Sequence, residues 1–148
     1  MALPSTGAAR NDGTQHAHFL RHRIQFSDAN LSAVAGATGG VKIGRLPARA
    51  YITMVDLHVV TAFNSATSDN LQIGGFVPAT GVGADILAAT SIHATGLTHA
   101  TAAAGLGLGA SGIGTGDVDV WIKNVIVGAG PTTGDATIII IYVPDNDT

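Results

Sequence analysis

The sharpest alternation of polar and apolar residues lies in the stretch DVDVWIK, residues 117–123. Successive side chains of a strand point to opposite faces, so this stretch is predicted to form a strand with one apolar and one polar face. Trp121, the only tryptophan of the chain, falls on the polar face beside Asp119 and Lys123. A tryptophan in that place is typical of a partner contact, and equally of a residue that a loop of its own chain covers.

A second strand pattern lies in HFLRHRIQF, residues 18–26. Its even positions combine His18 and His22 with apolar residues, and its odd positions include Arg21 and Arg23. The pattern predicts a half-buried strand with an arginine face. Residues 1–17 are small and polar, so we expect them to form an arm that is ordered by a partner.

Two further stretches are apolar at both sets of alternate positions. One covers residues 50–63 and follows a short strand that Gly44 and Pro47 interrupt, and the other is TIIIIYV, residues 137–143. A strand that is apolar on both faces is expected in the middle of a sheet, with the core on one side and a second sheet or another subunit on the other. As an exposed edge, TIIIIYV would promote aggregation.

The remaining stretches carry weaker signals. Strands are predicted at NLQIGGF and, less clearly, at ADILAAT, although residues 85–96 also fit a short helix capped by Asp85. Residues 27–40 have the composition of a loop. The glycine- and alanine-rich residues 96–116 are predicted to form a long connection or exposed tip.

About six to eight short strands without a long helix predict an all-β fold, an antiparallel β-sandwich, and the jelly roll is the commonest eight-stranded form at this length. We expect an extended N-terminal arm at residues 1–17, the sandwich domain at 18–143 and a C-terminal tail at 144–148.

The composition narrows the possible chemistry. The chain has no cysteine and no glutamate, so a metal site would have to use histidine and aspartate. The N-terminus lacks the apolar segment of a secretory signal, and we expect the protein to remain in the cytoplasm until it joins an assembly. The longest uncharged run, residues 86–116, is interrupted by His, Thr and Gly and is not expected to cross a membrane.

The charges are divided unevenly along the chain. Residues 1–50 hold six of the seven basic residues and two aspartates, a net charge of +4, whereas residues 51–148 hold Lys123 and eight aspartates, a net charge of −7. A basic end on an acidic body suggests an arm that meets an acidic surface, or a contact between the basic end of one copy and the body of another.

No catalytic pattern is convincing. Asp117 and Asp119 are closely spaced carboxylates, as sugar cleavage requires, but they fall on a predicted solvent face where their pKa values would not be perturbed. Asp56 and His58 share a face of the long central strand and are predicted to satisfy each other at an interface. GLGASG, residues 107–112, matches G-x-G-x-x-G without the required strand and helix around it. We therefore expect neither an enzyme nor a cofactor.

The N-terminal histidines leave a metal-binding alternative open. His16 and His18, followed by His22, are similar to the first metal motif of cupins, and imidazoles two residues apart on a strand converge on one side. The motif lies at the extreme N-terminus, however, and no second histidine motif follows it in the usual strand pairing. A basic contact segment with half-buried histidines is the interpretation we prefer.

One family resemblance extends this interpretation. Residues 39–75, GGVKIGRLPARAYITMVDLHVVTAFNSATSDNLQIGG, and residues 132–143, TTGDATIIIIYV, resemble small virion proteins of tailed bacteriophages. The resemblance implies a head decoration, or cement, protein: a jelly-roll homotrimer that sits on the capsid surface and bridges neighbouring major capsid subunits. It also implies a virion location after assembly in the host cytoplasm.

The sequence thus predicts a structural phage protein whose partners are the major capsid protein and further copies of itself, and not a nucleic acid or a membrane. The candidate contact residues are Arg10, Arg21, Arg23 and Trp121. Two alternatives stay open: a cupin-like metal-binding protein that uses His16, His18 and His22, and a carbohydrate-binding tail or fibre module that uses Trp121.

Overall fold

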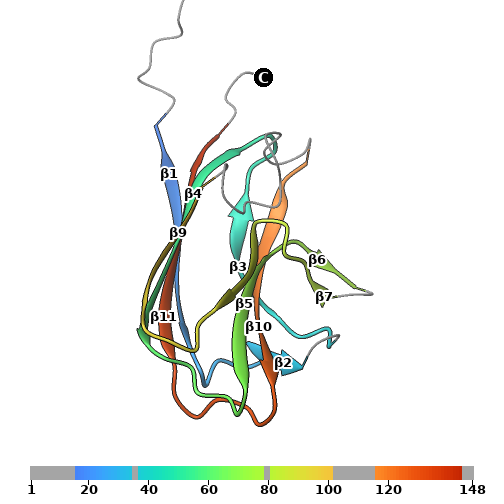
Figure 1. Cartoon of the computed structure of the whole chain (residues 1–148). Coiled ribbons are helices and arrows are strands. Elements are labelled where there is room, and N and C mark those ends of the chain that lie inside the picture. Colours follow the sequence, from blue (N-terminus) through green and yellow to red (C-terminus); the bar gives the residue numbers. More distant parts are fainter. Residues whose placement is uncertain (1–15, 35–36, 79–80, 102–115, 145–148) are drawn as a thin grey trace, which may run out of the picture.

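The computed structural model of the chain describes residues 16–34, 37–78, 81–101 and 116–144. Within these residues the chain forms two β-sheets that face each other, and a small hairpin lies outside one of them (Figure 1). None of the described residues belongs to a helix with the length and apolar character that crossing a membrane requires. The all-β sandwich predicted from the sequence is confirmed.

Sheet A, as we name it, consists of four antiparallel strands in the order β1-β11-β4-β9. The strands are β1 (His18–Gln25), β11 (Asp135–Val143), β4 (Tyr51–Thr61) and β9 (Gly96–Thr101). Both strands that are apolar on two faces, β11 and β4, are central, as the sequence predicts. The outer strands of sheet A are β1 and β9, so the arginine strand lies at an edge.

Sheet B has the order β2-β10-β5-β8, and β3 also pairs with β10. Its strands are β2 (Ser32–Val34), β3 (Val41–Leu46), β5 (Ser68–Gly74), β8 (Leu87–Ser91) and β10 (Val118–Val127). All its pairs are antiparallel except β2 with β10. The hairpin of β6 (Phe76–Val77) and β7 (Gly81–Val82) lies on the outer side of this sheet (Figure 1).

The core lies between the two sheets and is aliphatic. Alternate residues along the strands of sheet A, and likewise along those of sheet B, point inward and are buried. The main members are Ile24, Val55, Leu57, Ile138, Ile140, Leu71, Ile73, Val120 and Ile122. Where β1 crosses β3, a Cβ on Gly44 would lie 2.6 Å from Cδ1 of Leu20, so the absence of a side chain there allows the sheets to approach.

The weak strand predicted at residues 84–90 is confirmed, because residues 87–91 form β8, in which Leu87 and Thr90 pair with Ile73 and Leu71 of β5, and the alternative helix does not form. Two other local predictions are wrong. Residues 96–101 are not part of a connection: they form β9, whose backbone is paired with β4 and whose Ala100 is buried. The loop predicted at residues 27–40 contains β2, a parallel partner of β10. In each case a partner distant in sequence supplies the hydrogen bonds, and local propensity does not reveal it.

Candidate interaction surfaces

The outer face of sheet A is apolar along one row of paired residues. Phe19 of β1 pairs with Ile141 of β11, and Ile141 pairs with Met54 of β4. Phe19 is 72% exposed, and the other two side chains are half-buried. Leu97 on β9 is 56% exposed on the same face but lies two rows away, opposite His58. The apolar cluster of this face is therefore the row of Phe19, Ile141 and Met54, and contiguous apolar surface marks an interaction site more often than an isolated exposed side chain does.

The next row across the same face is charged at its ends. Arg21 pairs with Ile139, Ile139 with Asp56, and Asp56 with His99, in the order β1-β11-β4-β9. His99 Nδ1 lies 2.6 Å from Asp56 Oδ1. Arg21 is exposed and makes no ion pair with any residue in the described part of the chain.

Arg23, two residues along β1, is held by its own chain. Its Nε donates to Asp135 Oδ1 at 2.9 Å and its Nη2 donates to Asp135 Oδ2, which makes a two-pronged contact between β1 and β11. The guanidinium lowers the pKa of the Asp135 carboxyl, chiefly through these hydrogen bonds. Of the two arginines predicted on this face, Arg21 therefore has the uncommitted charge.

The predicted pair of Asp56 and His58 does not form. Asp56 instead contacts His99 on the neighbouring strand β9, and His58 is exposed opposite Leu97. Residues two apart on one strand lie about 6.6 Å apart along it, whereas directly opposite residues on paired strands lie about 5 Å apart. The cross-strand partner is thus the nearer one, and β9 was missing from the predicted sheet.

The outer face of sheet B is covered by other parts of the chain. Lys123, predicted on a polar face, is only 3% exposed, and its Nζ donates to the carbonyl of Ala37 at 2.8 Å. Trp121 is half-buried, and its ring lies 4.7 Å from that of Phe76 between centroids. The face of β10 that is predicted to meet solvent is therefore packed beneath residues 37–40 and the β6–β7 hairpin. For Trp121 the sequence predicts either a partner contact or cover by its own chain, and the structure shows the ring in contact with Phe76 of its own chain.

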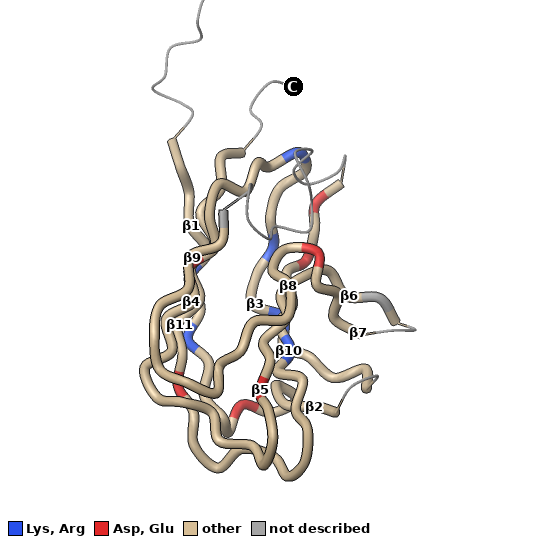
Figure 2. Tube along the Cα trace, in the orientation of Figure 1, with Lys and Arg blue, Asp and Glu red and all other residues tan. Residues whose placement is uncertain are grey.

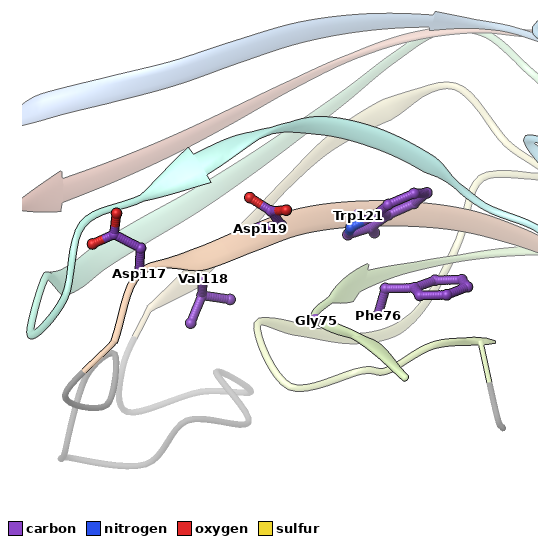
Figure 3. Close-up of a pocket in the computed structure, with 6 residues that line it drawn as sticks. All are labelled: Gly75, Phe76, Asp117, Val118, Asp119 and Trp121. Atoms are coloured by element: carbon purple, nitrogen blue, oxygen red, sulfur yellow. The ribbon is translucent and has the colours of Figure 1, made fainter. Parts of the chain in front are cut away.

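An open groove of about 350 Å³ remains beside this layer. Figure 3 shows Asp117, Val118, Asp119 and Trp121 along β10, with Gly75 and Phe76 on the facing segment. The groove therefore combines an aromatic pair with two carboxylates. Phe76 was not recognised from the sequence, because the short β6 strand carries no alternation.

The carboxylates of the groove are engaged in ion pairs on the surface. Asp119 accepts from Arg45 Nε at 2.8 Å and lies 2.8 Å from Lys42 Nζ, and Asp117 accepts from the backbone N–H of Ala48 at 3.0 Å. These charges gather along β3 and the start of β10 (Figure 2). Hydrogen bonds from Lys42 and Arg45 lower the pKa of Asp119, which is the opposite of what a general acid needs. The two carboxylates lie at the surface, as predicted, but they are ion-paired and the pKa of Asp119 is lowered, which the sequence does not predict.

The N-terminal histidines do not converge. His18 stacks on Tyr142 with ring centroids 5.7 Å apart, and His22 is half-buried on the same face of β1 as Ile24. Among the described residues, no group of three or more His, Cys, Asp or Glu side chains could hold a metal ion. Arg10, the fourth predicted contact residue, lies outside the described residues.

A polar cluster inside one end of the sandwich was missed by the sequence analysis. Asp69 is fully buried and accepts from Ser65 N–H at 2.8 Å, Ser65 Oγ at 2.8 Å and Asn124 Nδ2 at 2.7 Å, and His93 Nδ1 lies 3.0 Å from its Oδ2. Burial raises the pKa of Asp69, but the hydrogen bonds from Asn124, Ser65 and His93 outweigh this and hold it below its usual value. The cluster ties β5 to β10, to the segment before β5 and to the segment after β8, which is a structural role.

Comparison with known proteins finds chains of similar structure but no match by sequence. No family model matches the chain, and no curated protein matches it. Three solved structures are similar in fold. A chain of the capsid of Ralstonia phage GP4 has a TM-score of 0.60 and 23% sequence identity, and the match covers 93% of this chain and 90% of that chain. A chain of the Cyanophage Pam1 capsid has a TM-score of 0.56 and 17% identity, with 96% of this chain and 99% of that chain covered. A chain of the capsid of Helicobacter pylori bacteriophage KHP30 has a TM-score of 0.50 and 12% identity, with 86% of each chain covered. At these identities the similarity establishes a shared fold.

Proposed function

We propose that the protein is a structural component of a bacteriophage virion, without enzymatic activity, that decorates and stabilises the capsid as a homotrimeric cement protein. The observation that carries this proposal is the fold shared, over nearly the whole length of both chains, with proteins in three phage capsids. The order of the main strands, β1-β11-β4-β9 facing β3-β10-β5-β8, supports the jelly-roll form of the sandwich.

The surface chemistry also supports an assembly role. A protein that acts by joining larger bodies needs apolar surface beyond its own core, and the outer face of sheet A provides Phe19, Ile141 and Leu97. The groove beside Trp121 has carboxylates that are already bound to Lys42 and Arg45, an arrangement suited to a rigid surface. Many identical copies on a lattice multiply weak contacts into firm attachment.

The proposed partner in the capsid is the major capsid protein, and the proposed contact is the arm of residues 1–17 with Arg10. This arm holds one arginine and one aspartate, Arg10 and Asp12, so we propose that Arg21, at the start of the sandwich domain, adds positive charge that attracts an acidic surface. The strands β1 and β11 bring the beginning and the end of the sandwich domain to the same end of the molecule (Figure 1). The arm would then leave the trimer on the side that faces the capsid, and the protein would lie on the capsid surface after assembly in the host cytoplasm.

The experiment is a co-sedimentation assay with capsids of the virus that encodes the chain, assembled without this protein. We expect the full chain to sediment with the capsids in a saturable ratio, and a variant that lacks residues 1–17 to remain trimeric and folded but to lose binding. Unchanged capsid binding by the truncated variant would disprove the role of the arm, and absence of binding by the full chain would disprove the decoration role itself.

A further inference from the structure

Arg21 and Asp56 form no ion pair with each other within one chain. They lie in one row of the outer face of sheet A but are separated by β11, with Ile139 between them. Two strand spacings place their Cα atoms about 10 Å apart, and both side chains stand away from the sheet on the same side rather than along it. Arg21 is exposed, whereas the side chain of Asp56 is 19% exposed, and the two lie on either side of an apolar centre at Ile139.

The two charges also have unused bonding capacity. The guanidinium of Arg21 has no partner among the residues that the structure describes. Asp56 uses Oδ1 for His99 at 2.6 Å, and within the same residues its Oδ2 has no donor. The neighbouring charge, Arg23, differs because Asp135 of its own chain already neutralises it. The row is thus an incomplete ion pair whose two halves lie on different strands.

We propose that a second copy of this chain covers the outer face of sheet A, with Arg21 of one copy bound to Asp56 of the next. The inference rests on the proposed homotrimer and names the surface that forms it. The face carries the basic Arg21 at the β1 edge and the acidic Asp56 on β4, next to His99 of β9, and it is apolar between them at Ile139, so it is complementary to itself in charge. A face with different charges at its two sides suits a head-to-tail contact, which closes into a ring when the rotation permits.

The opposite side of the molecule is a weaker candidate for the same contact. There the charges of Lys42, Arg45 and Asp119 are paired within the chain, and the apolar rings of Trp121 and Phe76 pack on each other. A contact between copies would have to displace these bonds before it gained its own. Sheet A offers the charge of Arg21, which is unpaired within the described residues, the second carboxylate oxygen of Asp56 and the exposed side chain of Phe19, so it is the surface that the second copy gains most by covering.

Charge reversal tests the pairing. In the full chain we would compare the wild type with Arg21→Asp, Asp56→Arg and the double variant Arg21→Asp/Asp56→Arg, by sedimentation velocity and by chemical cross-linking at matched concentrations. Each single variant places like charges opposite each other and should weaken assembly at least about tenfold, whereas the double variant restores opposite charges and should recover the wild-type oligomer. Failure of the double variant to recover, in a protein that circular dichroism shows to be folded, would overturn the pairing.

A matched pair of apolar variants tests the surface independently of the arginine. Leu97→Asp lies on sheet A and Val127→Asp on sheet B, and the two native side chains are 56% and 50% exposed. We expect Leu97→Asp to release monomers and Val127→Asp to leave the oligomer intact. The reverse result, or equal effects of both, would overturn the assignment to sheet A without requiring any variant to be unstable.

The co-sedimentation assay separates this inference from the proposed function. Wild-type protein that forms the sheet A oligomer but does not bind capsids would contradict the decoration role and leave the interface standing. Wild-type protein that binds capsids while all sheet A variants keep their oligomeric state would leave the decoration role standing and overturn the interface. A wild type that stays monomeric both in solution and on the capsid would overturn the interface directly.

Discussion

The outer faces of the two sheets differ in what covers them. Sheet B is partly covered by its own chain: residues 37–40 cover Lys123, and Phe76 of the β6–β7 hairpin packs on Trp121, while Val127 at the end of β10 is 50% exposed. Sheet A exposes Phe19 and Leu97 and presents Arg21 without a partner in the described part of the chain. Both sheets have equally buried inner faces. The outer face of sheet A is therefore the face on which we propose that a second copy binds.

The largest expected effect is a difference in stability between substitutions on the inner and the outer face of β11. Ile138 is fully buried on the inner face of β11, and Ile139 is half-buried on the outer face. Ile138→Ala should lower the free energy of unfolding by about 2–5 kcal/mol, because it leaves a cavity in the core. Ile139→Ala should lower that of the monomer by less than about 1 kcal/mol. Urea unfolding of both variants at low protein concentration measures the difference, and equal losses would contradict an uncovered outer face.

The second effect is the pH-dependent stabilisation of the fold by the buried carboxylate of Asp69 on β5. Because the pKa of Asp69 is lower in the folded protein than its usual value of 3.8, the ionised carboxylate stabilises the fold above that value. This stabilisation is lost as the pH falls below about 4 and through the folded pKa. Asp69→Asn should lower the free energy of unfolding at pH 7 by about 2 kcal/mol and give a flatter profile below pH 4. Parallel acid profiles for the wild type and the variant would contradict this role.

A smaller loss of stability is expected when the hydrogen bond that holds residues 37–40 over sheet B is removed. Lys123→Met keeps an unbranched side chain under residues 37–40 but leaves the carbonyl of Ala37 without its donor. We expect the free energy of unfolding to fall by about 1–2 kcal/mol. Hydrogen exchange should show faster exchange near Asn124, whose N–H donates to Leu31 beside the same cover. An unchanged exchange pattern would mean that Lys123 does not hold the cover in place.

The smallest effect is expected at the edge of sheet A. Arg23→Gln removes the contact with Asp135, but the arginine is solvent-exposed, and surface ion pairs of this kind contribute little. We expect the thermal midpoint of unfolding to change by no more than the experimental error. The same substitution should raise the pKa of Asp135 towards its usual value, which a carboxyl titration by NMR measures. A large loss of stability would show that this pair holds β1 in the sheet.

The sequence predicts which residues of the central strands face the core, but it does not predict the contacts between side chains of distant segments. The alternation in TIIIIYV places Ile138 and Ile139 on opposite faces of a central strand, and local pattern suffices for that. The partner of Asp56 could not be predicted, because it lies on β9, a short strand that precedes a glycine- and alanine-rich stretch and is defined by its pairing with β4.

The same reason explains why the interior and the cover of sheet B escaped prediction. Lys123 alternates as a surface residue does, and only the distant segment at residues 37–40 makes it a buried one. Asp69 looks like a turn residue in SATSD, but four polar contacts from three separate segments turn it into an interior group. Burial of a polar side chain depends on such distant partners, and a local pattern does not contain them.

Electron cryo-microscopy of the virions tests the account most directly, because it shows both the position of the chain and the face that it uses. The account predicts trimeric density on the capsid surface into which this β-sandwich fits, with Arg21 of one copy next to Asp56 of its neighbour and the outer face of sheet B turned away from the contact. A capsid without this chain, or a chain bound there as separate copies with the outer face of sheet A open to solvent, would contradict it.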